Sequence, residues 1–292
     1  MTNLKLSVFP FLLILLLFSN GSTIAQTVVE KNGKLQVIGR YLCNQYGEPI
    51  QLRGVSSHGL QWYSDCVNES SIKELRDNWG CDVVRVPVYL KQEGYLTDSV
   101  FYMKKVYEIV DACVDLGLYC IIDWHILTPG DPLAGEYNGA FLFFSSISRK
   151  YNGNINILYE ICNEPNPTIE SGGPDWDRIS EYAKPIIEEI RKNTDGIIIV
   201  GTPQWSQLVG DVVGKKLNYN NIMYAFHFYS GTHDFLKESF IDAAYRIPIF
   251  VTEWGITEAE NINSNLYLKQ SDNWIKNMER MKVSWCYWNF SD

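Results

Sequence analysis

The stretch INILYEICNEP, residues 155–165, decides the fold that the sequence predicts. It is a near-continuous apolar run that ends in Asn163, Glu164 and a proline. Such a run indicates a strand buried on both faces, as in a parallel sheet covered by helices. A carboxylate at the end of a buried strand is costly unless the site uses it. A second stretch, IPIFVTEWG at residues 247–255, ends in the same way at Glu253.

Eight strand-like runs follow one another from residue 50 onward. They cover residues 50–57, 81–88, 118–125, 155–163, 196–202, 221–229, 247–253 and 283–289. Between them, residues 69–79, 99–116, 176–192 and 265–281 carry apolar side chains at helical spacing. This alternation favours one closed (β/α)8 TIM barrel over a doubly wound sheet. The turn after the first strand also lacks the Gly-rich loop typical of dinucleotide-binding sheets.

The two ends of the sequence allow separate predictions. Residues 1–25 combine a basic residue, an apolar stretch and a small-residue cleavage pattern, which predicts a signal peptide and a secreted, extracellular protein. Residues 26–292 then form one domain. Its first part, 26–49, contains Asn32-Gly33 and Tyr46-Gly47 and is expected to form a hairpin or plug over the barrel bottom. No outer helix follows the eighth strand, so either the sequence is truncated at its C-terminal end, which we favour, or the N-terminal segment covers the gap.

The composition of the 292 residues narrows the class of protein. The net charge is −9 without a basic run, so nucleic acid and anionic membranes are not expected partners. Nine Trp and 18 Tyr suit a groove that stacks on flat hydroxylated ligands, with an aromatic core as the alternative. The seven cysteines have no metal-site spacing, so we expect no metal. Cys43, Cys66 and Cys113 are the better candidates for disulfides.

Polar and aromatic side chains gather at the carboxyl ends of the predicted strands, where barrels of this type form their active sites. They are His58, Trp62, Arg85, Tyr89, His125, Asn163, Glu164, Trp205, His227, Tyr229, Glu253 and Trp288. Each alone has an ordinary explanation as a helix start, an ion pair or a core ring. Their common register favours one site. Paired carboxylates among aromatic rings fit glycoside hydrolysis, which needs an acid/base and a nucleophile or second base.

The neighbours of the two glutamates suggest separate roles. The amide of Asn163 can hydrogen-bond a sugar 2-hydroxyl, which would place Glu164 beside the glycosidic oxygen as proton donor. Glu253 would then attack the anomeric carbon. Arg85 can hold Glu253 ionised, and Tyr229 can donate a second hydrogen bond to it. The two carboxyl groups are predicted to lie roughly 5 Å apart, the separation for retention.

Four further side chains are expected to support this pair. His125 and His227 are placed to contact substrate hydroxyls or to tune the two acids. Trp288 can stack on one sugar ring, and Trp62 on a more distant one. Asp123 is expected to bind Arg85 or the backbone rather than to react.

Six stretches in order resemble glycoside hydrolase family 5, and its secreted endo-β-1,4-glucanase (cellulase) subfamily in particular. They are RVPVY at 85–89, IDWH at 122–125, YEICNEP at 159–165, VGTPQWSQ at 200–207, YAFHFY at 224–229 and VTEWG at 251–255. The resemblance, which begins near residue 28, implies a retaining β-1,4-glucanase that needs no cofactor or metal and takes β-glucan polysaccharide. It implies Glu164 as acid/base and Glu253 as nucleophile. His58, Trp62 and Tyr89 match positions that bind sugar on the non-reducing side.

Other functions stay open on the same barrel. A mannanase, a xylanase or a mixed-linkage glucanase would share the glutamate pair. A non-catalytic carbohydrate-binding protein is the alternative from another class, but it would have no reason to keep both glutamates with Arg85 and Asn163. The chain ends before the Lys and Glu that follow the Trp288 segment in the family. We expect a monomer.

Overall fold

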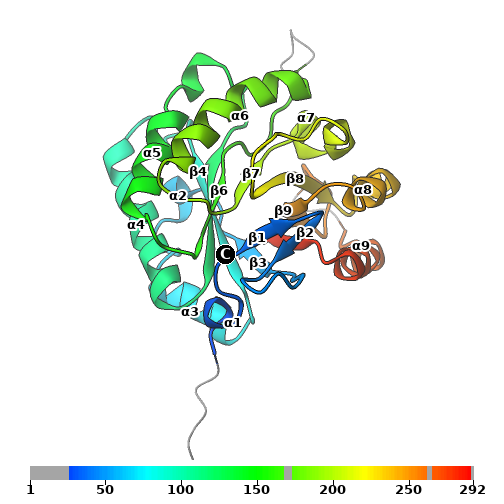
Figure 1. The fold of residues 1–292 in the computed structure, drawn as a ribbon, viewed down its shortest axis with the longest axis horizontal. Coiled ribbons are helices and arrows are strands. Elements are labelled where there is room, and N and C mark those ends of the chain that lie inside the picture. The colour runs from blue at the N-terminus through cyan, green and yellow to red at the C-terminus, as the bar shows by residue number, and fades with distance from the viewer. Residues whose placement is uncertain (1–25, 168–172, 262–264, 291–292) are drawn as a thin grey trace, which may run out of the picture.

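Eight parallel strands close into a barrel in the computed structural model, which describes residues 26–167, 173–261 and 265–290. The strands follow the order β10-β3-β4-β5-β6-β7-β8-β9 around the barrel, and helices surround them (Figure 1). Their bounds are β3 (Arg53–Ser56), β4 (Val83–Tyr89), β5 (Tyr119–His125), β6 (Ile157–Glu160), β7 (Ile198–Val200), β8 (Ile222–Tyr229), β9 (Ile249–Gly255) and β10 (Ser284–Trp288). The predicted (β/α)8 class is confirmed.

The predicted helices are present, and the structure adds others. The predicted four are α3 (Glu69–Asp77), α4 (Ser99–Asp115), α6 (Trp176–Arg191) and α9 (Leu268–Met281). The additional outer helices are α5 (Ala140–Lys150) and α8 (Lys237–Ala244), and short turns form α2 (Leu60–Tyr63), α7 (Pro203–Ser206), η1 (Gly135–Tyr137), η2 (Val209–Val212) and η3 (Asp234–Leu236). Sequence periodicity does not show α5, because its apolar residues surround the helix: Phe143 is buried, but Leu142 is 70% exposed.

Local sequence signals fix where the helices begin and end. The side chain of Asn68 accepts hydrogen bonds from two backbone N–H groups at the start of α3, and Asp98 and Asp175 cap α4 and α6 in the same way. Gly80 and Gly117 follow α3 and α4 with φ of +67° and +69°. This left-handed conformation stops a helix and favours glycine.

Alternate residues of each strand divide between two cores. Val84 and Val86 of β4 point outward and pack between the barrel and its helices, whereas Val83 belongs to a separate cluster inside the barrel. The inner cluster consists of Leu35, Leu42, Leu52, Val83, Tyr119, Ile121, Leu158, Ile197, Ile199, Met223, Ala225, Phe250 and Cys286. These residues lie near the starts of the strands, so the apolar core fills the bottom of the barrel and leaves its other end for polar groups.

The N-terminal segment closes the bottom, as predicted. It contains α1 (Val28–Asn32) and an antiparallel hairpin of β1 (Gln36–Ile38) and β2 (Tyr41–Cys43), which lies in front of the barrel in Figure 1. Leu35 and Leu42 join the inner cluster. The Tyr46-Gly47 turn is present, because the chain reverses there between β2 and an antiparallel bridge that pairs Cys43 with Pro49. Asn32-Gly33 instead ends α1, and a separate turn joins β1 to β2.

The outer side of β10 is less covered than the other strands. No helix follows β10 among the described residues, and Trp285 and Tyr287, whose rings contact Trp254, are only partly buried. The hairpin segment hydrogen-bonds to Asn221 and Ala244 instead. It therefore covers the barrel bottom and not this flank.

The disulfide prediction was wrong, because all seven cysteines are free thiols. Cys43 is buried in β2 at the barrel bottom, Cys113 is buried on the inner face of α4, and Cys66 is exposed after α2, so the three lie on different elements. Among the described residues, no helix is both long and apolar enough to cross a membrane. The predicted signal peptide, residues 1–25, lies outside the described part of the chain.

Candidate active site

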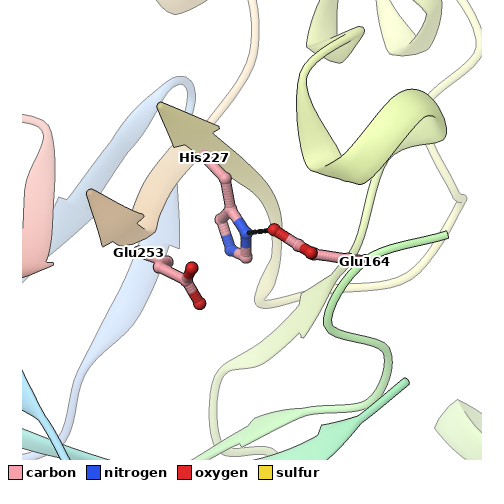
Figure 2. A group of neighbouring side chains, drawn as sticks. All are labelled: Glu164, His227 and Glu253. Carbon is pink, nitrogen blue, oxygen red and sulfur yellow. Dashed lines mark hydrogen bonds and ion pairs between the residues drawn. The ribbon is translucent and has the colours of Figure 1, made fainter. Parts of the chain in front are cut away.

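Glu164 and Glu253 converge at the carboxyl end of the barrel. Glu164 follows β6, Glu253 belongs to β9, and His227 of β8 lies between them (Figure 2). One carboxylate oxygen of each glutamate and a ring nitrogen of His227 all lie within 4.8 Å of one another. Glu253 is 6% exposed, and the side chain of Glu164 is 13% exposed. The two acids therefore share one small and mostly buried space.

A β-bulge explains how Glu253 reaches the barrel interior. The register of β8 with β9 shifts between Ala225, opposite Phe250, and His227, opposite Glu253. Strand β9 therefore carries one extra residue in this interval. Because of the bulge, the consecutive residues Thr252 and Glu253 both point into the interior, where alternation alone would allow only one.

Arg85 of β4 is the centre of a fully buried network. Its Nε donates to Glu160 Oε2 at 2.7 Å and its Nη1 to Glu253 Oε2 at 3.2 Å. Its Nη2 donates to Asn163 Oδ1 at 2.7 Å and forms an ion pair with Asp123 Oδ2 at 2.9 Å. The predicted contacts of Arg85 with Glu253 and with Asp123 are thus present. The guanidinium positions one nucleophile candidate and satisfies two other buried acids.

Tyr229 of β8 supplies the second partner of Glu253. Its hydroxyl donates to Glu253 Oε1 at 2.7 Å, as predicted, so that both carboxylate oxygens accept a hydrogen bond. Burial, followed by the charge of Glu253, raises the pKa of Tyr229 well above its ordinary value. The phenol therefore keeps its proton and stays a donor.

Asn163 is fully buried beside Glu164. Its amide nitrogen donates to the backbone oxygen of Ile126 at 3.2 Å and lies 3.5 Å from His125 Nε2, while its oxygen accepts from Arg85. The side chain is engaged within the protein and fixes the start of the Glu164 segment. Its contact with a sugar 2-hydroxyl stays a prediction.

His227 carries a positive charge in this environment. Its Nδ1 is 2.9 Å from Glu164 Oε1, and its Nε2 is 2.8 Å from Thr252 Oγ1. Burial alone would lower the pKa of His227, but the nearby carboxylates of Glu160, Glu164 and Glu253 raise it to about 9. The imidazolium is therefore placed to stabilise a negative charge on Glu164.

His125 is uncharged, in contrast to His227. Burial and the nearby charge of Arg85 lower the pKa of His125 to about 3, so the ring is neutral. Its Nδ1 is hydrogen-bonded to Asp123 Oδ2 at 2.6 Å. A neutral ring in this position leaves the positive charge of the site to Arg85 and His227.

Aromatic rings form one side of the site. The ring of His58 lies 5.2 Å from Trp62 and 5.1 Å from Trp288, and Tyr89 lies 5.2 Å from Trp62 and 4.1 Å from His125. Trp62 is 49% exposed and is free to stack on a ligand. The structure thus brings together the residues that were predicted to bind sugar on the non-reducing side.

A cavity of about 610 Å³ lies on the other side and contains Glu164, His227 and Glu253. The predicted Trp205 lines it and is 40% exposed. Three consecutive non-glycine residues, 204–206, have φ between 55° and 58°. Hydrogen bonds from Trp205 N to Pro165 O and from Ser206 Oγ to Asn163 O hold this strained turn against the Glu164 segment. Of the twelve predicted residues, five line this cavity, namely Glu164, Trp205, His227, Tyr229 and Glu253. Tyr89 and His125 line a second cavity, and Arg85 and Asn163 are fully buried. Their roles stay predictions.

Sequence reasoning assigned no role to Glu160 or Thr252. Both are fully buried, and Thr252 Oγ1 donates to Glu160 Oε1 at 2.7 Å. The available signal was Glu160 itself, an ionisable group within an apolar strand that requires a buried partner. The cavity also includes residues that had not been singled out: Gln207, Thr232, His233, Glu258, Ala259, Glu260 and Asn261.

Glu164, His227 and Glu253 are close enough to be considered as metal ligands. However, both ring nitrogens of His227 are engaged, one with Glu164 and the other with Thr252. The imidazole therefore has no free lone pair for an ion, and this donor set does not fit a metal. The expectation of a metal-independent site stays a prediction.

A close carboxylate pair between an aromatic wall and an open cavity is the arrangement of glycoside hydrolases. Comparison with known proteins identifies the family. The sequence profile described as Cellulase (glycosyl hydrolase family 5) matches residues 43–292. The chain belongs to this family, as its six motifs predicted.

Individual relatives agree with this assignment. An endoglucanase of Thermobifida fusca is 39% identical over 277 residues, and an endoglucanase of Clostridium saccharobutylicum is 43% identical over 264 residues. These matches cover 91% and 89% of this chain but 57% of each relative, so the chain spans little more than half of their length. The crystal structure of the catalytic domain of Thermobifida fusca endoglucanase Cel5A with cellotetraose is similar with a TM-score of 0.86 at 38% identity, covering 91% of this chain and 88% of that one.

Proposed function

We propose that this chain is a secreted, monomeric endo-β-1,4-glucanase that hydrolyses cellulose-type β-glucans with retention of anomeric configuration. One observation carries the proposal: a carboxylate oxygen of Glu164 and one of Glu253 lie within 4.8 Å. Retaining enzymes hold their two carboxyl groups about 5–5.5 Å apart, whereas inverting enzymes leave about 6.5–9.5 Å for a water molecule. The short separation supports direct attack by one carboxylate.

In the first step, Glu253 attacks the anomeric carbon and Glu164 gives its proton to the glycosidic oxygen. The bond from C1 to that oxygen breaks, and a glycosyl ester forms on Glu253. Arg85 and Tyr229 bond both oxygens of Glu253, which fixes the attacking carboxylate. The imidazolium of His227 donates to the carboxylate that remains on Glu164.

In the second step, Glu164 acts as a base. It removes a proton from a water molecule that attacks C1 and releases Glu253. Two inversions at C1 give net retention, and Glu164 returns to its protonated form. The charge of His227 does not change in the cycle, because its Nδ1–H only stabilises the charge on Glu164 while its Nε2–H stays bonded to Thr252.

The preference for a neutral glucan rests on the walls of the cleft. Exposed rings such as Trp62 and Trp205 offer flat apolar faces that stack on pyranose rings without requiring a charge on the ligand. The cellotetraose bound to the Thermobifida fusca relative is such a β-glucan chain. A reducing-sugar panel on carboxymethyl-cellulose, glucomannan, xylan and lichenan tests the preference. The highest kcat/KM is expected on the cellulose derivative, and a higher value on another polymer overturns the assigned substrate.

The catalytic roles are tested by Glu164→Gln and Glu253→Gln. Each change keeps the shape of the side chain but removes its acid/base or nucleophilic character, so hydrolysis of carboxymethyl-cellulose should fall by about 10³-fold or more. Glu181→Gln, on the exposed face of α6, is the matched control and should retain activity. Normal activity in either site variant would refute the role of that glutamate and favour a binding protein or a different site.

A further inference from the structure

A chain of buried hydrogen bonds leads away from Glu164 into the barrel. His227 Nδ1 lies 2.9 Å from Glu164 Oε1, and His227 Nε2 lies 2.8 Å from Thr252 Oγ1. Thr252 Oγ1 is 2.7 Å from Glu160 Oε1. Thr252 and Glu160 have no exposed surface, and His227 is 2% exposed. The side chains of His227, Thr252 and Glu160 are therefore shielded from solvent.

The same chain continues to the second catalytic candidate. Glu160 Oε2 accepts from Arg85 Nε at 2.7 Å, and Arg85 Nη1 donates to Glu253 Oε2 at 3.2 Å. Glu160 therefore connects the partner of Glu164 with the partner of Glu253. The β9 bulge makes this possible, because it turns Thr252 inward together with Glu253.

The direction of each hydrogen bond follows from the ionised state of Glu160. Burial would raise the pKa of Glu160, but the charges of Arg85 and His227 outweigh it and lower that pKa to about 2. A carboxylate can only accept hydrogen bonds, so the single hydroxyl hydrogen of Thr252 is donated to Glu160. The oxygen of Thr252 must then accept from His227 Nε2, which therefore carries a hydrogen.

We propose that Thr252 is a positioning residue that fixes the orientation of the His227 ring and keeps its Nε2 protonated, so that Nδ1 is always the nitrogen that faces Glu164. This inference rests on the proposed role of Glu164 as acid/base. With Nε2–H committed to Thr252, the imidazolium presents Nδ1–H to Glu164 each time that acid gives up its proton. Without the hydroxyl, the Nε2–H group loses its acceptor in the barrel interior, since Glu160 Oε1 is 3.8 Å away.

Several charged or titratable groups surround the imidazole ring of His227 and also influence its pKa. They are Glu160 and Glu164 from β6 and its following segment, Glu253 from β9, Asp123 and His125 from β5, Arg85 from β4 and His233 from the turn after β8. Substitution of Thr252 keeps all of these groups, and among them only Glu160 loses a hydrogen bond to the hydroxyl. A change in the ionisation of His227 in a Thr252 variant therefore reports the lost hydroxyl.

The test compares Thr252→Val, Thr252→Ser and the control Thr202→Val. Valine keeps the volume of threonine but cannot accept from Nε2–H, so the cation becomes less stable. The midpoint of the His227 titration, followed by ¹⁵N NMR, should move to lower pH by about one unit, and kcat should fall about tenfold with little change in KM. Serine should restore both values. Thr202 is also fully buried and its hydroxyl donates to the backbone oxygen of Ala225, so its variant should lose stability without moving the His227 titration midpoint.

A His227 titration midpoint that does not move in folded Thr252→Val overturns the inference. If that variant does not fold, ¹⁵N NMR of histidine-labelled wild-type protein tests the tautomer directly. The inference requires a protonated Nε2 on His227 on both sides of its titration, and a bare Nε2 contradicts it. The proposed function fails by a different result, namely an active Glu164→Gln variant, so the two failures can be told apart.

Discussion

The two ends of the barrel are built from the same strands but contain opposite chemistry. Near the start of β4 and β6, Val83 and Leu158 point inward and belong to the apolar cluster at the bottom. Two residues further along the same strands, Arg85 and Glu160 point inward and form an ion pair at 2.7 Å. Two residues along each strand thus separate the apolar core from the buried charged network.

This difference shows which end stabilises the fold and which serves the chemistry. Each fully buried aliphatic side chain at the bottom contributes roughly 1.5–3 kcal/mol, whereas buried charges contribute little net stability and are costly when unpaired. The charged end is nearly balanced: Arg85 and His227 are cations, and Glu160 and Glu253 face them. Burial, together with the nearby Glu160, raises the pKa of Asp123 well above its usual value despite Arg85, which limits the excess of negative charge.

The largest effect is expected from Arg85→Met, which removes the central cation of the buried charged network. Methionine is similar in length but leaves Glu160, Glu253 and Asp123 without their common partner. We expect a loss of about 3–5 kcal/mol in the free energy of unfolding, since the buried acids become unpaired. Hydrolysis should fall at the same time because Glu253 is no longer fixed. Urea titration and steady-state kinetics measure both, and a stable, active variant would contradict the network.

A substitution in the apolar cluster at the barrel bottom should lower the stability but not the activity. Leu158→Ala leaves a cavity inside the inner cluster, where Leu158 is 1% exposed, and should cost about 2–5 kcal/mol of stability. Its kcat/KM, measured well below the unfolding temperature, should equal that of the wild type. A large fall in kcat/KM would mean that the two ends are not as separate as their composition indicates.

The charged end should also give the stability a pH dependence. The pKa of His227 is raised from 6.5 to about 9, so its contribution is fully present below pH 6.5 and is lost as pH rises to 9. The loss should be about 3 kcal/mol. His227→Gln should flatten this part of the curve, whereas Leu158→Ala should shift the whole curve down without changing its slope. Equal slopes in all three proteins would argue against the charged His227.

The smallest effect is expected at the cavity rim. Trp205 is 40% exposed, so Trp205→Ala should change the stability little. Losing one stacking face should raise KM for a soluble glucan about fivefold and leave kcat nearly unchanged. An unchanged KM on substrates of any length would show that sugar does not contact this side of the cleft.

The sequence was sufficient to predict the barrel and the position of its polar residues. Near-continuous apolar runs indicate buried parallel strands, and the residue that ends each run must lie at the carboxyl edge. For this reason Glu164 and Glu253 lie close together, and Arg85, Tyr229 and His227 contact them. The direct contacts of Arg85 and Tyr229 with Glu253 followed from the same register argument.

The connections inside the barrel could not be predicted from the chain alone. Whether Glu160 meets Arg85 and Thr252 depends on the stagger between strands, and whether Thr252 points inward depends on a bulge that has no signal in the apolar pattern. Helix α5 was missed because its apolar residues include exposed ones. The left-handed turn at 204–206 was missed because it contains no glycine.

The anomeric form of the first product tests the central claim most directly. In ¹H NMR of a short β-1,4-glucan during the first turnovers, before mutarotation, we expect the newly formed reducing end to be the β-anomer. That result follows from attack on C1 first by Glu253 and then by water, a sequence supported by the two carboxylates lying within 4.8 Å of each other. A newly formed α-anomer would contradict the account, because it requires a single attack by water and removes the nucleophilic role of Glu253.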